Sequence, residues 1–193
     1  DMKIKTMRIK EKSPLFDDYI SNYEKVKEFF HWNFQTDLQD CIEKRGKDYQ
    51  NRKALAEVLL RQNKKLGASK NSLKNIEKFS DAKTMAVVTG QQAGILGGPL
   101  YTVYKILHAV KLAAQLREKY GEFEFITVFW MEVGDSDYKE INHLNVLNIQ
   151  SELQRLELPE DPTDGRSIFL RTIPKEMTDV FGKLEKLFPS NEF

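Results

Sequence analysis

The sequence has few residues of the types that build disulfides and metal sites. Cys41 is the only cysteine, which excludes a disulfide within the chain and any cysteine-based zinc cluster and fits a reducing compartment. No histidine-bearing motif surrounds Cys41, so we interpret it as a small apolar residue of a helix rather than a nucleophile. The three histidines lie far apart and lack the His-x-x-x-His spacing. We therefore expect no structural metal.

Long apolar runs and an excess of one charge are also missing. No run approaches the roughly 20 apolar residues of a membrane-spanning helix, and the amino-terminal stretch DMKIKTMRIKEK is charged, unlike a signal peptide. With 30 basic and 29 acidic residues the net charge is +1, so no overall field favours nucleic acid or an anionic membrane. We expect a cytoplasmic protein that binds neither.

Residues 1–80 are expected to form an α-helical region. The segments SPLFDDYISNYEKVKEFF, DYQNRKALAEVLLRQNKKLG and SKNSLKNIEKF have apolar residues three and four apart. Ser13 and Pro14 suit a helix cap and a first turn, and Gly67 suits a helix end.

Residues 81–193 have the pattern of an α/β domain. TMAVVT and FEFITVFWM are short, nearly continuous apolar runs, which is typical of strands buried in a parallel sheet. Between them PLYTVYKILHAVKLAAQLREKYG predicts a helix that ends at Gly121. The apolar stripe expected on this helix comprises Leu100, Val103, Leu107, Val110 and Ala114. The order predicts a βαβ unit of a Rossmann-like parallel sheet.

Fewer elements are indicated after this unit. EINHLNVLNI predicts a third strand near residues 143–149, LPEDPTDG a loop, and DVFGKLEKLFPSNEF a short helix. Three strands are few for a sheet of this type, so we expect the chain to be a fragment of a longer protein.

Glycine is scarce except in one place. Four of the ten glycines fall between Gly90 and Gly98, where a strand passes into a helix and where ligands bind in open α/β sheets. Glycines let backbone approach a ligand, the first-turn N–H groups have no partner within a helix, and Pro99 suits the first helical position. The loop therefore favours a phosphate or carboxylate. The alternative is that its glycines only permit tight packing of strand against helix.

Polar side chains around this loop supply further contacts. Amides, hydroxyls and one ammonium group are available to an anion, and Lys105 is the expected counter-charge. The predicted binding residues are Thr89, Gly90, Gln91, Gln92, Gly94, Gly97, Gly98, Tyr101 and Thr102. Neither the P-loop pattern nor the Gly-x-Gly-x-x-Gly dinucleotide pattern is present.

A second polar cluster, FWMEVGDSDYKEINH, follows the next strand. Asp135 and Asp137, with Glu132 and Glu140 nearby, are expected at the same rim as the glycine loop. There they could hold an ammonium group, coordinate Mg²⁺ through water or orient His143 for proton transfer. The alternative is that Asp135 or Ser136 caps a following helix. Trp130 is interpreted as core or, less favoured, as pocket wall.

Both clusters together resemble one family. The motif VTGQQAG-hydrophobic-x-GGPLYT-hydrophobic-YK, matched from Val88 to Lys105, and the VFW strand followed by an acidic stretch resemble the cysteine ligase family of bacillithiol biosynthesis, BshC. The resemblance implies a Rossmann-like core similar to nucleotidyltransferases, incomplete here, and a coiled coil elsewhere in a longer, homodimeric protein.

The resemblance also implies an activity. The family is expected to be a ligase that forms an amide bond between the cysteine carboxyl group and the amino group of glucosaminyl-malate, with ATP or another nucleotide activating the carboxylate and Mg²⁺ as a further candidate cofactor. The loop and helix start would surround a phosphate or carboxylate, Lys105 would neutralise charge, Asp135 and Asp137 would bind an ammonium group, and His143 would transfer a proton.

One departure from the family motif opens an alternative. Where the family usually has Glu-Asp-His-Asp, this chain has Gly134, Asp135, Ser136 and Asp137. A role of the missing histidine cannot be carried over, so the alternative function is a non-catalytic nucleotide- or metabolite-binding module of the same fold.

Overall fold

Helices make up the first part of the chain, as the sequence predicts. The protein is seen in a computed structural model that describes residues 14–33, 36–134, 137–159 and 165–188. The chain divides into two units, residues 1–85 and 86–193, which are described separately. The expected cap at Ser13 lies outside the described residues. No helix in the described ranges is long and apolar enough to cross a membrane.

The first unit begins with shorter helices than predicted. Helix α1 covers Pro14–Ser21, and a 3-10 turn, η1, follows at Tyr23–Lys25. Asn22 interrupts them with non-helical backbone angles, and its side-chain amide donates to Asp18 Oδ1 at 3.1 Å. Asparagine has a low helix propensity, which fits the break at this position. The single helix predicted over this segment is therefore wrong.

The remaining helices of this unit are α2 at Leu38–Asp48, α3 at Arg52–Lys65 and α4 at Lys70–Lys78. Gly67 ends α3 with φ 70°, its N–H donates to Lys64 O at 3.2 Å, and Ala68 N–H donates to Asn63 O at 3.0 Å. This is the Schellman pattern, so the prediction of a helix end at Gly67 is confirmed. The half-buried Cys41 lies in α2.

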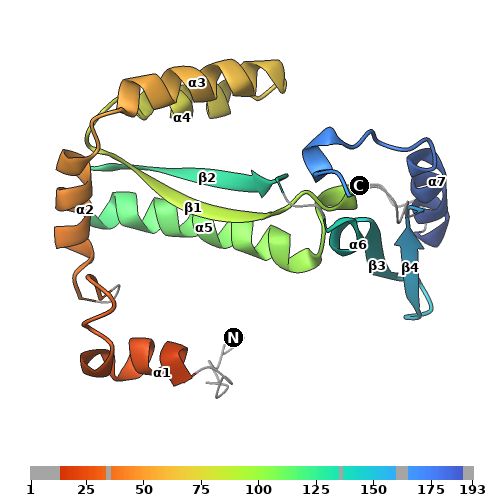
Figure 1. The fold of residues 1–193 in the computed structure, drawn as a ribbon, viewed down its shortest axis with the longest axis horizontal. Helices are drawn as coiled ribbons and strands as arrows, with labels where there is room; N and C mark the ends of the chain where they lie inside the picture. The colour runs from red at the N-terminus through yellow and green to blue at the C-terminus, as the bar shows by residue number, and fades with distance from the viewer. Residues whose placement is uncertain (1–13, 34–35, 135–136, 160–164, 189–193) are drawn as a thin grey trace. The chain divides into compact units, whose positions relative to one another are not determined.

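A βαβ unit opens the second part of the chain. Strand β1 covers Thr84–Gln92, helix α5 Leu100–Lys119 and strand β2 Glu124–Glu132, and the two strands pair in parallel. Figure 1 shows α5 running along the strand pair. The α/β class and the strand, loop, helix, strand order predicted from the sequence are confirmed.

The face that α5 buries differs from the predicted one. Leu100, Val103, Leu107 and Val110 are exposed, whereas Thr102, Ala109 and Ala113 are buried. Small side chains on the buried face let the helix lie close to its sheet. The apolar stripe read from the sequence is therefore solvent-facing in this chain.

The chain then forms a separate antiparallel hairpin rather than extending the parallel sheet. Strand β3, His143–Leu147, pairs with β4, Leu153–Glu157, with His143 opposite Glu157. The third predicted strand thus exists, but in another sheet, and β4 was not predicted. The remaining elements are η2 at Ile95–Gly97, α6 at Tyr138–Ile141, η3 at Ile168–Leu170 and α7 at Met177–Leu187.

The hairpin, the glycine loop and α7 share a small core. Its buried side chains are Ile95, Leu156, Leu158 and Val180. Six half-buried residues pack against them: Tyr138, Leu144, Val146, Met177, Leu184 and Leu187. Ile95 anchors the loop after β1 in this core, so the hairpin positions the loop. The predicted C-terminal helix is confirmed as α7, and most of the predicted LPEDPTDG loop lies outside the described residues.

Candidate functional site

The end of β1 explains the first glycine of the motif. A Cβ at Gly90 would lie 2.6 Å from the Trp130 carbonyl oxygen and 3.1 Å from Trp130 Cβ on the neighbouring strand. Any other residue would force the two strands apart. Gly90, Gln91 and Gln92 are therefore strand residues, and the predicted loop over residues 90–98 begins only at Ala93. The close-packing alternative explains this glycine.

The loop between β1 and α5 is a tight turn. A Cβ at Gly94 would lie 2.8 Å from the Cα atom of Gly98, and Gly98 has φ 75°. Pro99 is the N-cap of α5, with extended backbone angles, and not its first helical residue. The predicted position of the loop, at the carboxyl end of β1 and directly before this helix, is confirmed.

A buried hydroxyl lies at the base of this turn. Thr102 is 4% exposed, and its Oγ1 has no hydrogen-bond partner among the described residues. It lies 3.6 Å from the position of a Cβ at Gly98. A buried hydroxyl without a partner is costly, so this atom is a candidate contact for an oxygen of a ligand.

The side chains of Gln91, Tyr101 and Lys105 form one network. The ammonium group of Lys105 donates to Gln91 Oε1 at 2.9 Å, and Gln91 Nε2 donates to the Tyr101 hydroxyl at 3.0 Å. Lys105 Nζ also lies 5.5 Å from the centre of the Tyr101 ring, a cation–π distance. The end of the strand and the start of the helix thus hold Lys105 in place.

A pocket of about 470 Å³ lies beside this network. Its volume is in the range of small-molecule sites. Polar side chains come both from the βαβ part of the second unit and from the part that contains α6 and the hairpin. Gln92 Nε2 donates to Glu140 Oε2 across the pocket. The lining residues are Gln91, Gln92, Gly94, Pro99, Leu100, Tyr101, Glu140, Ile141, His143, Leu144 and Asn145.

The structure brings together only some of the predicted residues. Gln91, Gln92, Gly94, Tyr101 and His143 line the pocket. Lys105 adjoins it through Gln91, whereas Thr102 lies under the turn. The remaining predicted residues of β1 and the turn, which shape the backbone around it, are Thr89, Gly90, Gly97 and Gly98.

The acidic cluster is only partly described. Asp135 lies outside the described residues, and Asp137 occupies the N-cap position of α6 without a side-chain capping bond. Glu132 Oε1 instead accepts from Gly134 N–H at 2.6 Å, and Glu132 Oε2 accepts from the Trp130 ring nitrogen at 3.3 Å. Trp130 is 63% exposed, so its interpretation as core is wrong.

Sequence reasoning missed several polar groups of the site. Asn145 lines the pocket, and Asn142 is 1% exposed beside His143. Glu140, which the sequence placed near the two aspartates, lines the pocket as well. Arg155 and Glu157, from the unpredicted β4, form an ion pair at 2.9 Å close to them. The only signal in the sequence was the Glu-Ile-Asn-His spacing of residues 140–143.

Comparisons with known proteins identify the family. The chain matches the model "Bacillithiol biosynthesis BshC, N-terminal Rossmann-like domain" over residues 2–193. Proteins named "Putative cysteine ligase BshC" from Chloroherpeton thalassium and Symbiobacterium thermophilum are 36% and 34% identical over 95% and 91% of this chain. A protein of the same name from Chlorobium phaeobacteroides is 30% identical over 94% of the chain.

The matched region is one part of these relatives. It covers 34% of the Chloroherpeton protein, 33% of the Chlorobium protein and 32% of the Symbiobacterium protein. The Rossmann-like assignment made from the βαβ pattern and the resemblance drawn from the glycine motif are both confirmed. The chain belongs to the BshC family of bacillithiol biosynthesis, within its N-terminal Rossmann-like domain.

Proposed function

We propose that the protein carrying this chain is a ligase that joins the carboxyl group of cysteine to the amino group of glucosaminyl-malate. The observation that carries the proposal is the family match over residues 2–193. A carboxylate does not acylate an amine unaided near neutral pH, because its oxygen is a poor leaving group. ATP, or another nucleotide, supplies the activation when bound.

The turn between β1 and α5 is the proposed site for the anionic group of a substrate or nucleotide. Thr102 Oγ1 is buried without a partner in the described residues and lies beside Gly98. The start of the 20-residue helix α5 adds a positive dipole end. Lys105 is held nearby by Gln91. These groups fit the oxygens of a phosphate or carboxylate.

The amine substrate is proposed to bind on the acidic side of the pocket. Asp135 and Asp137 would bind its ammonium form, and the Glu140 carboxylate lines the same pocket as His143. Mg²⁺ is a further candidate cofactor, as the counter-ion of nucleotide phosphates; the described residues include no cluster of three side chains that could hold it by themselves. His143 is the proposed proton acceptor.

A second candidate function rests on one sequence feature. Gly134 and Ser136 replace the glutamate and histidine of the usual motif, which favours a non-catalytic module that binds a nucleotide or metabolite. Both proposals place the protein in the cytoplasm as a homodimer when full length, without nucleic acid or membrane partners.

Incubation of the full-length protein with cysteine, glucosaminyl-malate and ATP tests the two functions. A ligase forms the cysteinyl amide, detected by mass spectrometry, and consumes one ATP for each product molecule. A binding module gives no product but still binds ATP or glucosaminyl-malate in calorimetric titration. Absence of both product and binding would overturn both proposals.

A further inference from the structure

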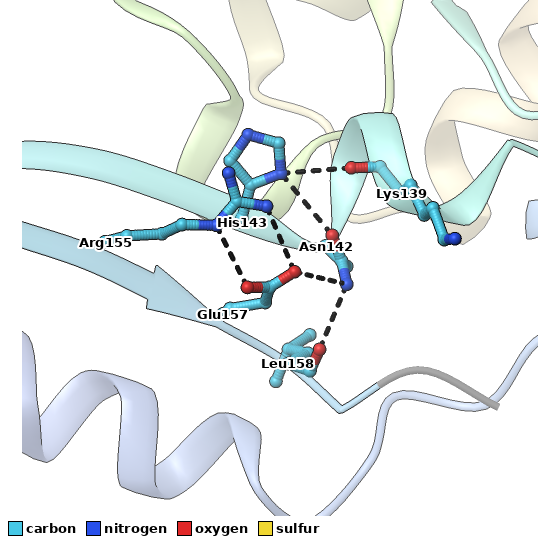
Figure 2. A network of polar contacts seen from close by, with 6 residues as sticks. All are labelled: Lys139, Asn142, His143, Arg155, Glu157 and Leu158. Atoms are coloured by element: carbon cyan, nitrogen blue, oxygen red, sulfur yellow. Dashed lines mark hydrogen bonds and ion pairs between the residues drawn. The ribbon is translucent and has the colours of Figure 1, made fainter.

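Asn142 is the least exposed large side chain of the site. It is 1% exposed and joins α6 to β3. Its Nδ2 donates to Leu158 O at 3.0 Å and to Glu157 Oε1 at 3.4 Å, as Figure 2 shows. A carbonyl and an ionised carboxylate only accept hydrogen bonds. The amide nitrogen is therefore fixed on the β4 side, and Oδ1 must face the other way.

Two oxygens converge on one nitrogen of His143. Nδ1 lies 3.0 Å from Lys139 O, in the last turn of α6, and 3.4 Å from Asn142 Oδ1. Neither oxygen can donate, so Nδ1 must carry the hydrogen. In a neutral imidazole the other nitrogen, Nε2, then holds the lone pair.

The surroundings of His143 combine charges from two elements. Lys139 and Glu140 belong to α6, and Arg155 and Glu157 belong to β4. Arg155 holds the Glu157 carboxylate through Nε at 2.9 Å and Nη2 at 3.1 Å. Glu157 thus stays ionised as the acceptor that orients Asn142. His143 Nε2 has no hydrogen-bond partner among the described residues, while its side chain lines the pocket with Glu140.

We propose that Asn142 is a positioning residue that, with the Lys139 carbonyl, holds His143 in the Nδ1–H tautomer and leaves Nε2 free to accept a proton from the amine substrate. This inference rests on the proposed ligase function for its chemistry. The bound ammonium group first loses one proton to water, and the neutral amine nitrogen then bonds to the activated carboxyl carbon of cysteine. An oxygen leaving group departs with its electron pair, and one amine proton passes to Nε2. The resulting imidazolium keeps both Nδ1–H contacts.

The tautomer is measurable without any activity. In the 193-residue chain labelled with ¹⁵N in its histidine rings, Nδ1 of the neutral His143 imidazole should show the chemical shift of a protonated nitrogen. Nε2 should show that of a nitrogen without a hydrogen. His143→Gln assigns the signals against His31 and His108. A predominant Nε2–H tautomer in the unaltered chain would overturn the inference.

Substitution of Asn142 measures its contribution to the tautomer ratio of His143. Loss of one hydrogen bond, worth about 0.5 to 1.5 kcal/mol, should shift the tautomer ratio of Asn142→Ala roughly 2- to 13-fold toward Nε2–H. Gln154→Ala, on the same hairpin opposite Val146, is the matched control and should leave the ratio unchanged. An equal shift in both variants would assign the effect to general loosening of the hairpin.

Kinetics of the full-length protein complete the test. Asn142→Ala should lower kcat and leave KM for the amine nearly unchanged, because the tautomer matters when the proton moves. A KM effect alone would contradict a positioning role. If the unaltered protein forms no amide product while its His143 is the Nδ1–H tautomer, the ligase proposal fails and the structural inference stands.

Discussion

The βαβ half and the hairpin half of the second unit differ in how they bury apolar side chains. The hairpin packs its inward residues against α7 and Ile95 into a closed core. In the βαβ half several large side chains face solvent: Val88, Leu107, Val110, Trp130 and Met131. The polar pocket draws on both halves, since β1 supplies Gln91 and Gln92 and the hairpin half supplies Glu140 and His143.

This difference shows that the apolar pattern of a segment indicates which side chains can be buried. It does not indicate whether another element of the fold covers them. Helix α5 has apolar residues around much of its circumference, and β2 buries only the side that carries Ala109 and Ala113. The hairpin has fewer apolar residues, and α7 packs against those of its inward face, whereas Leu147 and Leu153 are exposed. We therefore expect the free energy of unfolding to depend mainly on the hairpin core. Stabilisation of the charge of a bound substrate should depend mainly on the βαβ half.

The largest expected effect tests the packing side of this comparison. Leu156→Ala, at a core position 6% exposed, should lower the free energy of unfolding by roughly 2 to 5 kcal/mol, because it leaves a cavity. Leu107→Ala, on the exposed face of α5, should change it by no more than about 0.5 kcal/mol. Denaturant unfolding of the chain measures both. Equal losses would show that α5 is as well covered as the hairpin.

The next effect tests whether the βαβ half stabilises charge in the transition state. Lys105→Ala in the full-length protein should lower kcat roughly 10²- to 10³-fold, about 2.7 to 4 kcal/mol, if its charge stabilises the transition state. Lys111→Ala, on the exposed face of the same helix, is the control and should keep the normal rate. A change in KM without a change in kcat would reassign Lys105 to substrate binding.

A smaller effect is expected from the two aspartates proposed to bind the amine substrate. Asp137→Asn and Asp135→Asn keep the shape of the side chain but remove the charge that pairs with an ammonium group. Each should weaken binding of the amine substrate roughly 10- to 150-fold, as expected for a charged hydrogen bond of about 1.5 to 3 kcal/mol. Calorimetric titration measures the affinity, with Asp179→Asn on α7 as control. Unchanged affinity in both variants would show that the two aspartates do not bind the amine substrate and have a structural role.

The smallest effect concerns the surface of the hairpin. Hydrogen bonding to Arg155 lowers the pKa of Glu157 below its ordinary value. The stabilisation that this pair gives the folded state is therefore complete above the ordinary carboxyl pKa. It is lost as the pH falls through the lower folded-state pKa of Glu157. Both side chains are about half exposed, so the effect is small. Glu157→Gln and Arg155→Gln should each flatten the acid side of the stability–pH curve, and an unchanged curve would discount the pair.

Local sequence signals predicted the elements that depend on neighbouring residues. The βαβ order, the end of α3 at Gly67 and the turn before α5 follow from apolar runs, glycine and proline within a few positions. The extension of β1 to Gln92 was not predicted, because the need for glycine at position 90 comes from Trp130 on another strand. Strand β4 was missed, since its residues LQRLE alternate in burial only once β3 lies beside them.

The sequence by itself determined the family, through the motif from Val88 to Lys105, and the α/β class. Both follow from the types of residues that lie within a few positions of one another. Tertiary structure alone decided which face of α5 is buried, that β3 pairs with β4, and that Asn142 meets Glu157 and Leu158. Such contacts depend on segments distant in the chain coming together, and the tautomer of a histidine depends on the atoms placed around it.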